Sequence, residues 1–182
     1  GDACPDKPDH SQGYVWALTP SYDLFSANKD GSDVVRLTDT PGYDAEATIS
    51  PKGDRIVFTS TRDGDLDLYS MKLDGTDVRR LTDALGYDGG AFFSSDGQKI
   101  VFRAQHPTDP KEVEDYKALL AQDLVRPTRL DIWIMNADGS NAHVLSPAGG
   151  NSQGPSFSPD SQWVTFTAYF DHPNDDHGCE IY

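Results

Sequence analysis

Short runs of hydrophobic residues alternate with polar turns, and the same runs return along the chain. The segment from Gly42 to Phe58, GYDAEATISPKGDRIVF, returns 44 residues later as GYDGGAFFSSDGQKIVF. A second motif, DLFSANKDGSDVVRLTD in its first copy, begins at Asp23, Asp67 and Asp131, and a last EIY begins at Glu180. Self-similarity at about this period is typical of repeat architectures. The chain is therefore expected to consist of copies of one small unit.

Each unit is expected to form four short β-strands. The third strand, DLFSAN, DLYSMK or DIWIMN, alternates between its two faces, and an Asp-Gly pair then favours a tight turn before the fourth strand. The first strand is expected at Ala47–Ser50, Ala91–Ser94 and Pro155–Ser158. The second, rich in Ile, Val and Phe, is expected at Arg55–Thr59, Lys99–Arg103 and Trp163–Thr167. Four strands in roughly 40–45 residues are typical of one blade of a β-propeller.

The expected fold class is all-β, a β-propeller of four-stranded antiparallel blades with one short helical insertion. Strands of a first blade fall within residues 1–40, with Val15–Leu18 as the candidate second strand. A second blade spans residues 41–85, a third spans 86–148, and the start of a fourth spans 149–182. These make about three blades, whereas a closed ring takes about four to eight. We expect a larger six- or seven-bladed ring, or an assembly in which a second copy completes the complementary half blades.

The pattern LTD…GYD…SPDG…IVFTS.RDG…DLYSM..DG resembles the WD40-like (PD40-type) repeats of TolB-type propellers, over about residues 15–182. The chain departs from that pattern at Ser95, which replaces the turn proline, at Ser161, which replaces the turn glycine, and in two long insertions. The resemblance implies a non-enzymatic propeller of six or seven blades in the periplasm or outside the cell.

The first insertion, residues 106–130, carries helix signals. Asp109 suits the N-cap, Pro110 suits the first helical position, and Glu112 completes a capping-box pattern. Four apolar side chains share one helical face: Val113, Tyr116, Leu119 and Leu120. A helix of about three turns is expected at the rim or over the mouth of the propeller. It either covers apolar blade surface or acts as a lid or partner-docking element.

Loops on a rigid scaffold are where binding residues concentrate. The loops that lead into the first strands are expected to surround the mouth of the central channel. The candidate ligand- or partner-binding residues are Tyr43, Asp44, Glu46, Arg62, Tyr87, Asp88, Arg103, Asn151 and Gln153. Their carboxylates either gather a cation or a basic group of a ligand, or accept backbone N–H bonds in the turns.

Two motifs suggest other chemistry but lack its structural context. Gly150–Gly154 matches the G-x-S-x-G motif around Ser152, but a strand is expected after it instead of a helix. Asp63, Asp65 and Asp67 have the spacing of a calcium loop without the later glycine and glutamate of an EF-hand, which leaves a calcium site of another kind as the alternative. No catalytic residue is assigned, and we do not expect an enzyme.

The second insertion, YFDHPNDDHGC, gathers groups that can bind metals beside Cys179. They are Asp171, His172, Asp175, Asp176 and His177. Their spacing matches no closed structural site, so they either bind a divalent cation such as zinc or Ca²⁺ or form a solvated loop. No cofactor is expected beyond such a cation.

The chain is strongly acidic, with 30 acidic and 15 basic residues and a net charge of -15. This charge disfavours nucleic acid and anionic membranes as partners and favours cations or basic protein surfaces, or it only keeps the protein soluble. No apolar run approaches the roughly 18 residues of a membrane span. Cys4 and Cys179 permit one disulfide, and the GDAC start, without Met or signal peptide, suggests a mature product or a piece of one.

Three functional hypotheses follow. The first is a non-catalytic scaffold that binds a protein or a small ligand through the loop face bearing the insertions. The second is the propeller domain of a longer hydrolase, similar to the gating domain of the prolyl oligopeptidase family. The third is a structural protein that self-assembles through its open blade edges.

Overall fold

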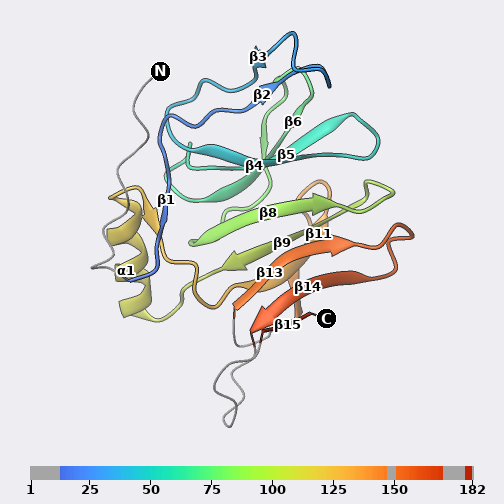
Figure 1. Ribbon diagram of the computed structural model, residues 1–182. Coiled ribbons are helices and arrows are strands. Elements are labelled where there is room, and N and C mark those ends of the chain that lie inside the picture. The colour runs from blue at the N-terminus through green and yellow to red at the C-terminus, as the bar shows by residue number, and fades with distance from the viewer. Residues whose placement is uncertain (1–12, 147–150, 170–178, 182) are drawn as a thin grey trace.

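Three antiparallel sheets lie side by side in the computed structural model, which describes residues 13–146, 151–169 and 179–181 (Figure 1). The second blade contains β4 (Asp44–Ile49), β5 (Arg55–Ser60), β6 (Asp67–Lys72) and β7 (Arg79–Arg80), in that order. The third contains β8 (Tyr87–Phe93), β9 (Lys99–Gln105), β11 (Asp131–Asn136) and β12 (His143–Ser146). The fourth contains β13 (Asn151–Phe157), β14 (Val164–Tyr169) and β15 (Cys179–Ile181). The expected fold class, a partial β-propeller of antiparallel blades, is confirmed.

The alternation along each strand explains why the sheets stack. In β5, Ile56 and Phe58 contribute to one hydrophobic cluster, whereas Val57 between them belongs to another, shared with the third blade. Successive side chains of a strand point to opposite faces of the sheet, so a blade with two apolar faces buries both only between two neighbours. Phe102 of β9 packs into the shared cluster from the other side. Because the apolar positions recur in every repeat, neighbouring blades share a hydrophobic core between their facing sheets.

The Asp-Gly turns between third and fourth strands also hold neighbouring blades together. Gly75 and Gly139 have φ of 82° and 88°, as such turns require. A Cβ on Gly75 would lie 2.7 Å from the carbonyl oxygen of Leu37, and one on Gly139 would lie 2.7 Å from that of Leu81. Each of these turns therefore requires its glycine for two reasons, the positive φ and the close approach to the preceding blade.

The first blade differs from the sequence prediction. Its third and fourth strands, β2 (Phe25–Ser26) and β3 (Val35–Arg36), form a two-stranded sheet. The prediction that Val15–Leu18 is its second strand is wrong, because β1 (Trp16–Ala17) pairs instead with β10 (Leu124–Val125) of the first insertion. Val15 and Leu18 are buried there. The β1 strand therefore pairs with Leu124 and Val125, which are apolar residues more than 100 positions later in the chain.

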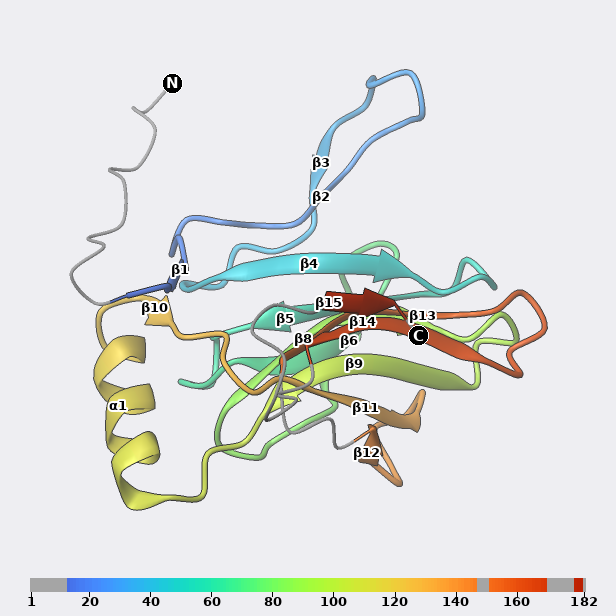
Figure 2. The same ribbon diagram turned by 60° about the horizontal axis from the view of Figure 1, so that its bottom comes forward.

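The helical insertion is confirmed as α1 (Pro110–Leu120), with the Asp109 side chain accepting hydrogen bonds from two backbone N–H groups of the first turn. Tyr116 and Leu119 are its buried residues. The Tyr116 hydroxyl bonds Asp65 and lies 2.7 Å from the carbonyl oxygen of Gly86, which fixes the helix to the second and third blades. Figure 2 shows α1, β1 and β10 together at one end of the sheets. Within the described ranges, no helix is long and apolar enough to span a bilayer.

The two end sheets expose apolar side chains. Phe25 and Val35 of the β2–β3 hairpin are 57% and 54% exposed, and Trp163, just before β14, is 72% exposed. In Figure 2 the hairpin projects away from the other sheets. Both end sheets therefore present surface that a further blade would bury.

Candidate binding site

The innermost strands of the blades begin earlier than predicted and carry most of the candidate residues. β4, β8 and β13 start at Asp44, Tyr87 and Asn151, so the prediction that these positions lie in loops is wrong. The register of each strand shifts near its start, as a β-bulge does. The shift lies between Ala45 and Thr48 in β4, between Gly89 and Phe92 in β8, and between Gln153 and Ser156 in β13. Such a bulge breaks the alternation from which strand limits are read in a sequence.

Two candidate carboxylates form buried ion pairs at equivalent places of successive blades. Asp44 accepts hydrogen bonds of 3.0 and 3.1 Å from Arg62, whose guanidinium stacks on the Phe58 ring. Asp88 lies 2.9 Å from Nε2 of His106 and is fully buried. Burial raises the pKa of Asp88, and the neighbouring His106 opposes that rise. In the structure, each of these carboxylates is therefore paired with a side chain of its own blade.

A second cluster joins the second and third blades at Glu46. Its carboxylate accepts hydrogen bonds from Arg103 Nη2 at 2.7 Å, from the Tyr87 hydroxyl at 3.0 Å and from the Gly90 N–H at 2.8 Å. The Arg103 guanidinium also lies over the rings of Trp16 and Tyr87, at 4.9 and 5.7 Å from their centroids. Burial, with the Glu46 charge, raises the pKa of Tyr87 well above its usual value. Three of the predicted residues thus form one rigid group.

The other candidates lie apart from this group. Tyr43 stacks on Tyr22 with centroids 6.0 Å apart, and burial raises its pKa to about 12. Asn151 donates a 3.2 Å hydrogen bond to the carbonyl oxygen of Pro127. Gln153 is partly exposed at the irregularity of β13. Most of the predicted set is therefore spread over three inner strands, whereas Tyr43 precedes β4, Arg62 follows β5 and Arg103 lies in β9.

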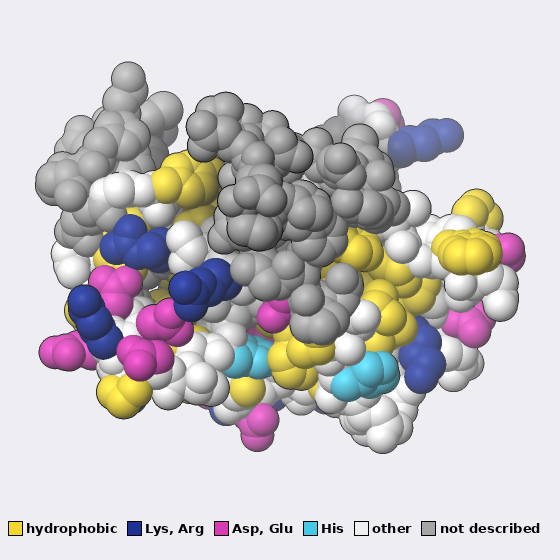
Figure 3. Space-filling view, turned by 90° about the horizontal axis from the view of Figure 1, so that it is seen from below, with side chains coloured by type: hydrophobic (Ala, Val, Ile, Leu, Met, Phe, Trp, Pro, Cys, Tyr) yellow, Lys and Arg dark blue, Asp and Glu magenta, His cyan; other side chains and the backbone are white. Residues whose placement is uncertain are grey.

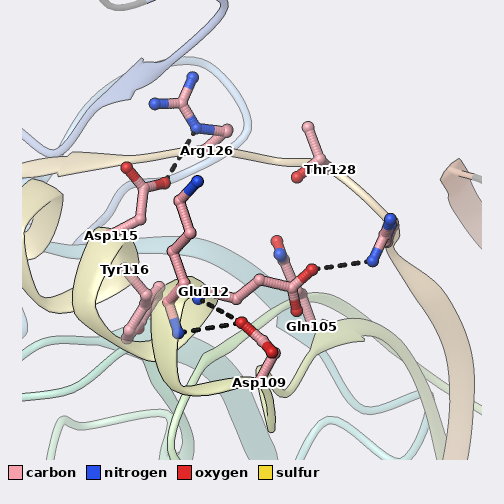
Figure 4. Close-up of a pocket in the computed structure, with 9 residues that line it drawn as sticks. Gln105, Asp109, Glu112, Asp115, Tyr116, Arg126 and Thr128 are labelled. Atoms are coloured by element: carbon pink, nitrogen blue, oxygen red, sulfur yellow. Dashed lines mark hydrogen bonds and ion pairs between the residues drawn. The ribbon is translucent and has the colours of Figure 1, made fainter.

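A pocket that sequence reasoning missed lies between α1 and the segment that follows β10 (Figure 4). Its volume is about 460 Å³. Arg126 and Arg129 pair with Asp115 and Glu112 of the helix, at 3.2 and 2.8 Å. Basic and acidic side chains are intermixed over this part of the surface, at the left of Figure 3. Only the packing of the helix creates the pocket, so the sole sequence signal was the insertion itself.

The alternative metal and serine sites gain no support from the geometry. The carboxylates of Asp63, Asp65 and Asp67 bind three different donors, a tyrosine of β6, a tyrosine of α1 and an arginine of β7. Among the residues described, no group of three or more His, Cys, Asp or Glu is arranged to hold a metal ion. The metal candidates Asp171, His172, Asp175, Asp176 and His177 lie outside the described residues, as does Cys4 of the possible disulfide. Ser152 lies within β13, and its buried hydroxyl has no hydrogen-bond partner in the described ranges.

Solved structures with the same arrangement of blades support the fold. A protein described as TolB from Agrobacterium tumefaciens is 26% identical, with a TM-score of 0.64, over 81% of this chain and 50% of that one. TolB from Acinetobacter baumannii is 23% identical, with a TM-score of 0.62, over 82% of this chain and 32% of that one. Puromycin hydrolase, at 19% identity and a TM-score of 0.57, matches 87% of this chain and 26% of its own.

The chain thus spans about half of the first of these relatives and about a third of the second. A comparison with curated proteins found no significant match. The family profile described as "TolB beta propeller domain" matches residues 8–119, which is more than half of the 182 residues. The repeat, the blades and this match agree, and the chain belongs to the TolB beta propeller domain family.

Proposed function

We propose that this chain is a non-catalytic propeller scaffold that binds a protein or a small ligand through the face bearing α1. The observation that carries the proposal is the anchoring of α1 at one end of the blades. Tyr116 ties the helix to two blades, and β1 pairs with β10 beside it. A helix that is held in place, with a pocket along its side, is pre-organised for recognition because little order has to be gained on binding.

The charges around the pocket indicate which kind of partner surface would be complementary to it. Both charge signs are present on and beside α1, with Lys111 and Arg129 near Asp115 and Glu112. A partner with polar, complementary side chains fits such a surface better than a purely apolar one. The family resemblance supports a location in the periplasm or outside the cell, which fractionation of cells expressing the intact gene product would test.

Site-specific photo-crosslinking tests the proposed face. Glu114, exposed on α1, would be replaced by a photoreactive phenylalanine, and Asp54, exposed in a turn between first and second strands, would serve as the matched control. We expect a crosslinked product from position 114 in cells and none from position 54. Equal crosslinking from both positions, or none from position 114 and its helix neighbour Lys117, would contradict the proposal.

The fold shared with puromycin hydrolase motivates a second candidate, the propeller domain of a longer hydrolase. The buried Ser152 hydroxyl, without a hydrogen-bond partner in the described ranges, is not activated as a nucleophile must be. Labelling the intact gene product with a fluorophosphonate separates the two candidates. A labelled serine outside residues 1–182 would favour the hydrolase, and a labelled Ser152 would refute the non-catalytic proposal.

A further inference from the structure

The three inner strands share one unusual backbone position. Glu46 in β4, Gly90 in β8 and Gly154 in β13 occupy the same place in the repeat and have φ of 55°, 58° and 60°. Each lies in the register irregularity of its strand. The same backbone geometry therefore carries a glutamate in one blade and no side chain in the next two.

Between the second and third blades, the glutamate fills the space at this position. The Glu46 carboxylate accepts the N–H of Gly90, the equivalent position one blade further on, at 2.8 Å. It also accepts hydrogen bonds from Tyr87 and Arg103 of the third blade. One carboxylate of β4 thus binds two donors of β8 and one of β9.

Between the third and fourth blades, the equivalent carboxylate is missing because the residue is Gly90. A cavity of about 330 Å³ extends from β4 past Gly90 to Gly154 of β13. It is lined by Glu46, Ala47, Thr48, Gly90, Phe92, Arg103 and Gly154. The Gly154 N–H occupies the same position in the repeat as the Gly90 N–H, which donates to Glu46, and a Cβ on Gly154 would meet nothing within 4 Å. The cavity lies where the repeat would place a carboxylate.

The cavity also contains a fixed cation. Arg103 uses Nε for the Tyr87 hydroxyl, at 3.0 Å, and Nη2 for Glu46. Among the described residues, its Nη1 has no hydrogen-bond partner. The ring of Trp16 holds the guanidinium in place. A planar guanidinium with one free edge is suited to bind a carboxylate.

We propose that this cavity binds the carboxylate of a ligand, either a small carboxylic acid or an acidic side chain of a peptide. Its oxygens would accept hydrogen bonds from the Gly154 N–H and Arg103 Nη1, as Glu46 accepts from Gly90 and Arg103. The half-exposed Phe92 ring supplies an apolar wall for the carbon chain of the ligand. The inference goes beyond the proposed function, since the cavity shares no lining residue with the pocket beside α1.

Glycine-selective ¹⁵N labelling provides a direct test, because the chain has only 16 glycines and each one with a backbone amide gives a single signal. The protein would be titrated with propionate, with its neutral isostere propionamide, and with a short glutamate-containing peptide. We expect the Gly154 signal to shift saturably with propionate. Propionamide lacks the charge, and we expect its affinity to be at least about tenfold lower. Tighter binding of the peptide would assign the site to a partner protein, and equal affinity would assign it to a free small acid.

A variant that restores the repeat gives the second test. Gly90→Glu places a tethered carboxylate in the cavity, at a backbone conformation that Glu46 already adopts, and its Cβ would displace only the end of the Arg103 side chain. Gly53→Glu is the matched control, since Gly53 has φ of 65° and open space around it in a turn. We expect propionate binding about tenfold weaker in Gly90→Glu than in Gly53→Glu.

Three results would overturn the proposal. They are a Gly154 signal that propionate leaves unmoved, equal responses to propionate and propionamide, and equal loss of binding in the two variants. If Gly90→Glu does not fold, the comparison of propionate with propionamide on the unaltered protein still decides.

Discussion

The pair of Asp88 and His106 is expected to give the third blade a pH dependence that the second blade lacks. In the second blade, the equivalent partner of the carboxylate is Arg62 instead of a histidine, and histidine is the side chain that ordinarily changes its charge between pH 5 and 8. Burial lowers the pKa of His106, but its hydrogen bond to Asp88 and the charges of Asp88, Asp65 and Asp67 raise it overall. The ring also contacts Trp133, with centroids 4.8 Å apart. The perturbation is therefore His106→Arg, which copies the second blade.

The sign of the effect follows from proton binding. The folded protein holds the His106 proton more tightly than the unfolded chain, so this stabilisation is complete below the unfolded pKa of about 6.5 and is lost as pH rises through the folded value. Asp88, whose pKa is also raised, acts in the same direction at lower pH. A hydrogen bond between charged groups contributes about 1.5–3 kcal/mol and a neutral one about 0.5–1.5, so the loss is about 1 kcal/mol.

Urea unfolding at pH values of about 6 and 8.5 measures this loss. We expect the free energy of unfolding of the unaltered protein to fall by about 1 kcal/mol more than that of His106→Arg between these values. His143→Gln serves as the control, because His143 is exposed and contacts a backbone carbonyl. If His106→Arg retained the full pH dependence, or if His143→Gln abolished it, the reasoning would be refuted.

Three further predictions concern the packing of the blades. Gly75→Ala should destabilise the protein more than Gly31→Ala, because both pay about 1 kcal/mol for positive φ but only Gly75 meets the backbone of the preceding blade; thermal unfolding measures the difference. Tyr116→Phe should cost about 1.5–3 kcal/mol of local stability and speed hydrogen exchange in α1 while leaving β5 and β6 unchanged, and unaltered exchange in α1 would contradict its anchoring role. If open edges drive self-association, Phe25→Asp should reduce the mass measured by light scattering, and a protein already monomeric would exclude that assembly.

Much of the fold could be predicted from local signals. The Asp-Gly turns, the second strands of the second, third and fourth blades and the helix that begins after Asp109 are found where expected. Each depends on neighbours in the chain, such as a cap, a turn glycine or a period of two. The start of β4 could not be predicted in this way, because the bulge at Glu46 interrupts the alternation.

The candidate site was predicted as a set of residues but not as an arrangement. Sequence position identified Glu46, Tyr87 and Arg103, yet nothing in the sequence pairs a glutamate of one blade with an arginine 57 residues later. The pairing of Asp44 with Arg62 and of Asp88 with His106 likewise needed the end of a second strand to lie beside the start of a first. The pocket beside α1 required a helix to dock on strands distant in sequence.

By itself, the sequence determined the repeating unit, its strand order and its turns, because these depend on interactions among residues close together in the chain. The tertiary structure decided which face of each strand meets which blade, where β1 pairs, and which charges neutralise one another. Those outcomes depend on contacts between residues far apart in sequence, whose hydrophobic and electrostatic energies become available only when the blades stack. The replacement of Glu46 by Gly90 in the next repeat can be read in the sequence, but the cavity beside Gly90 exists only where the blades stack.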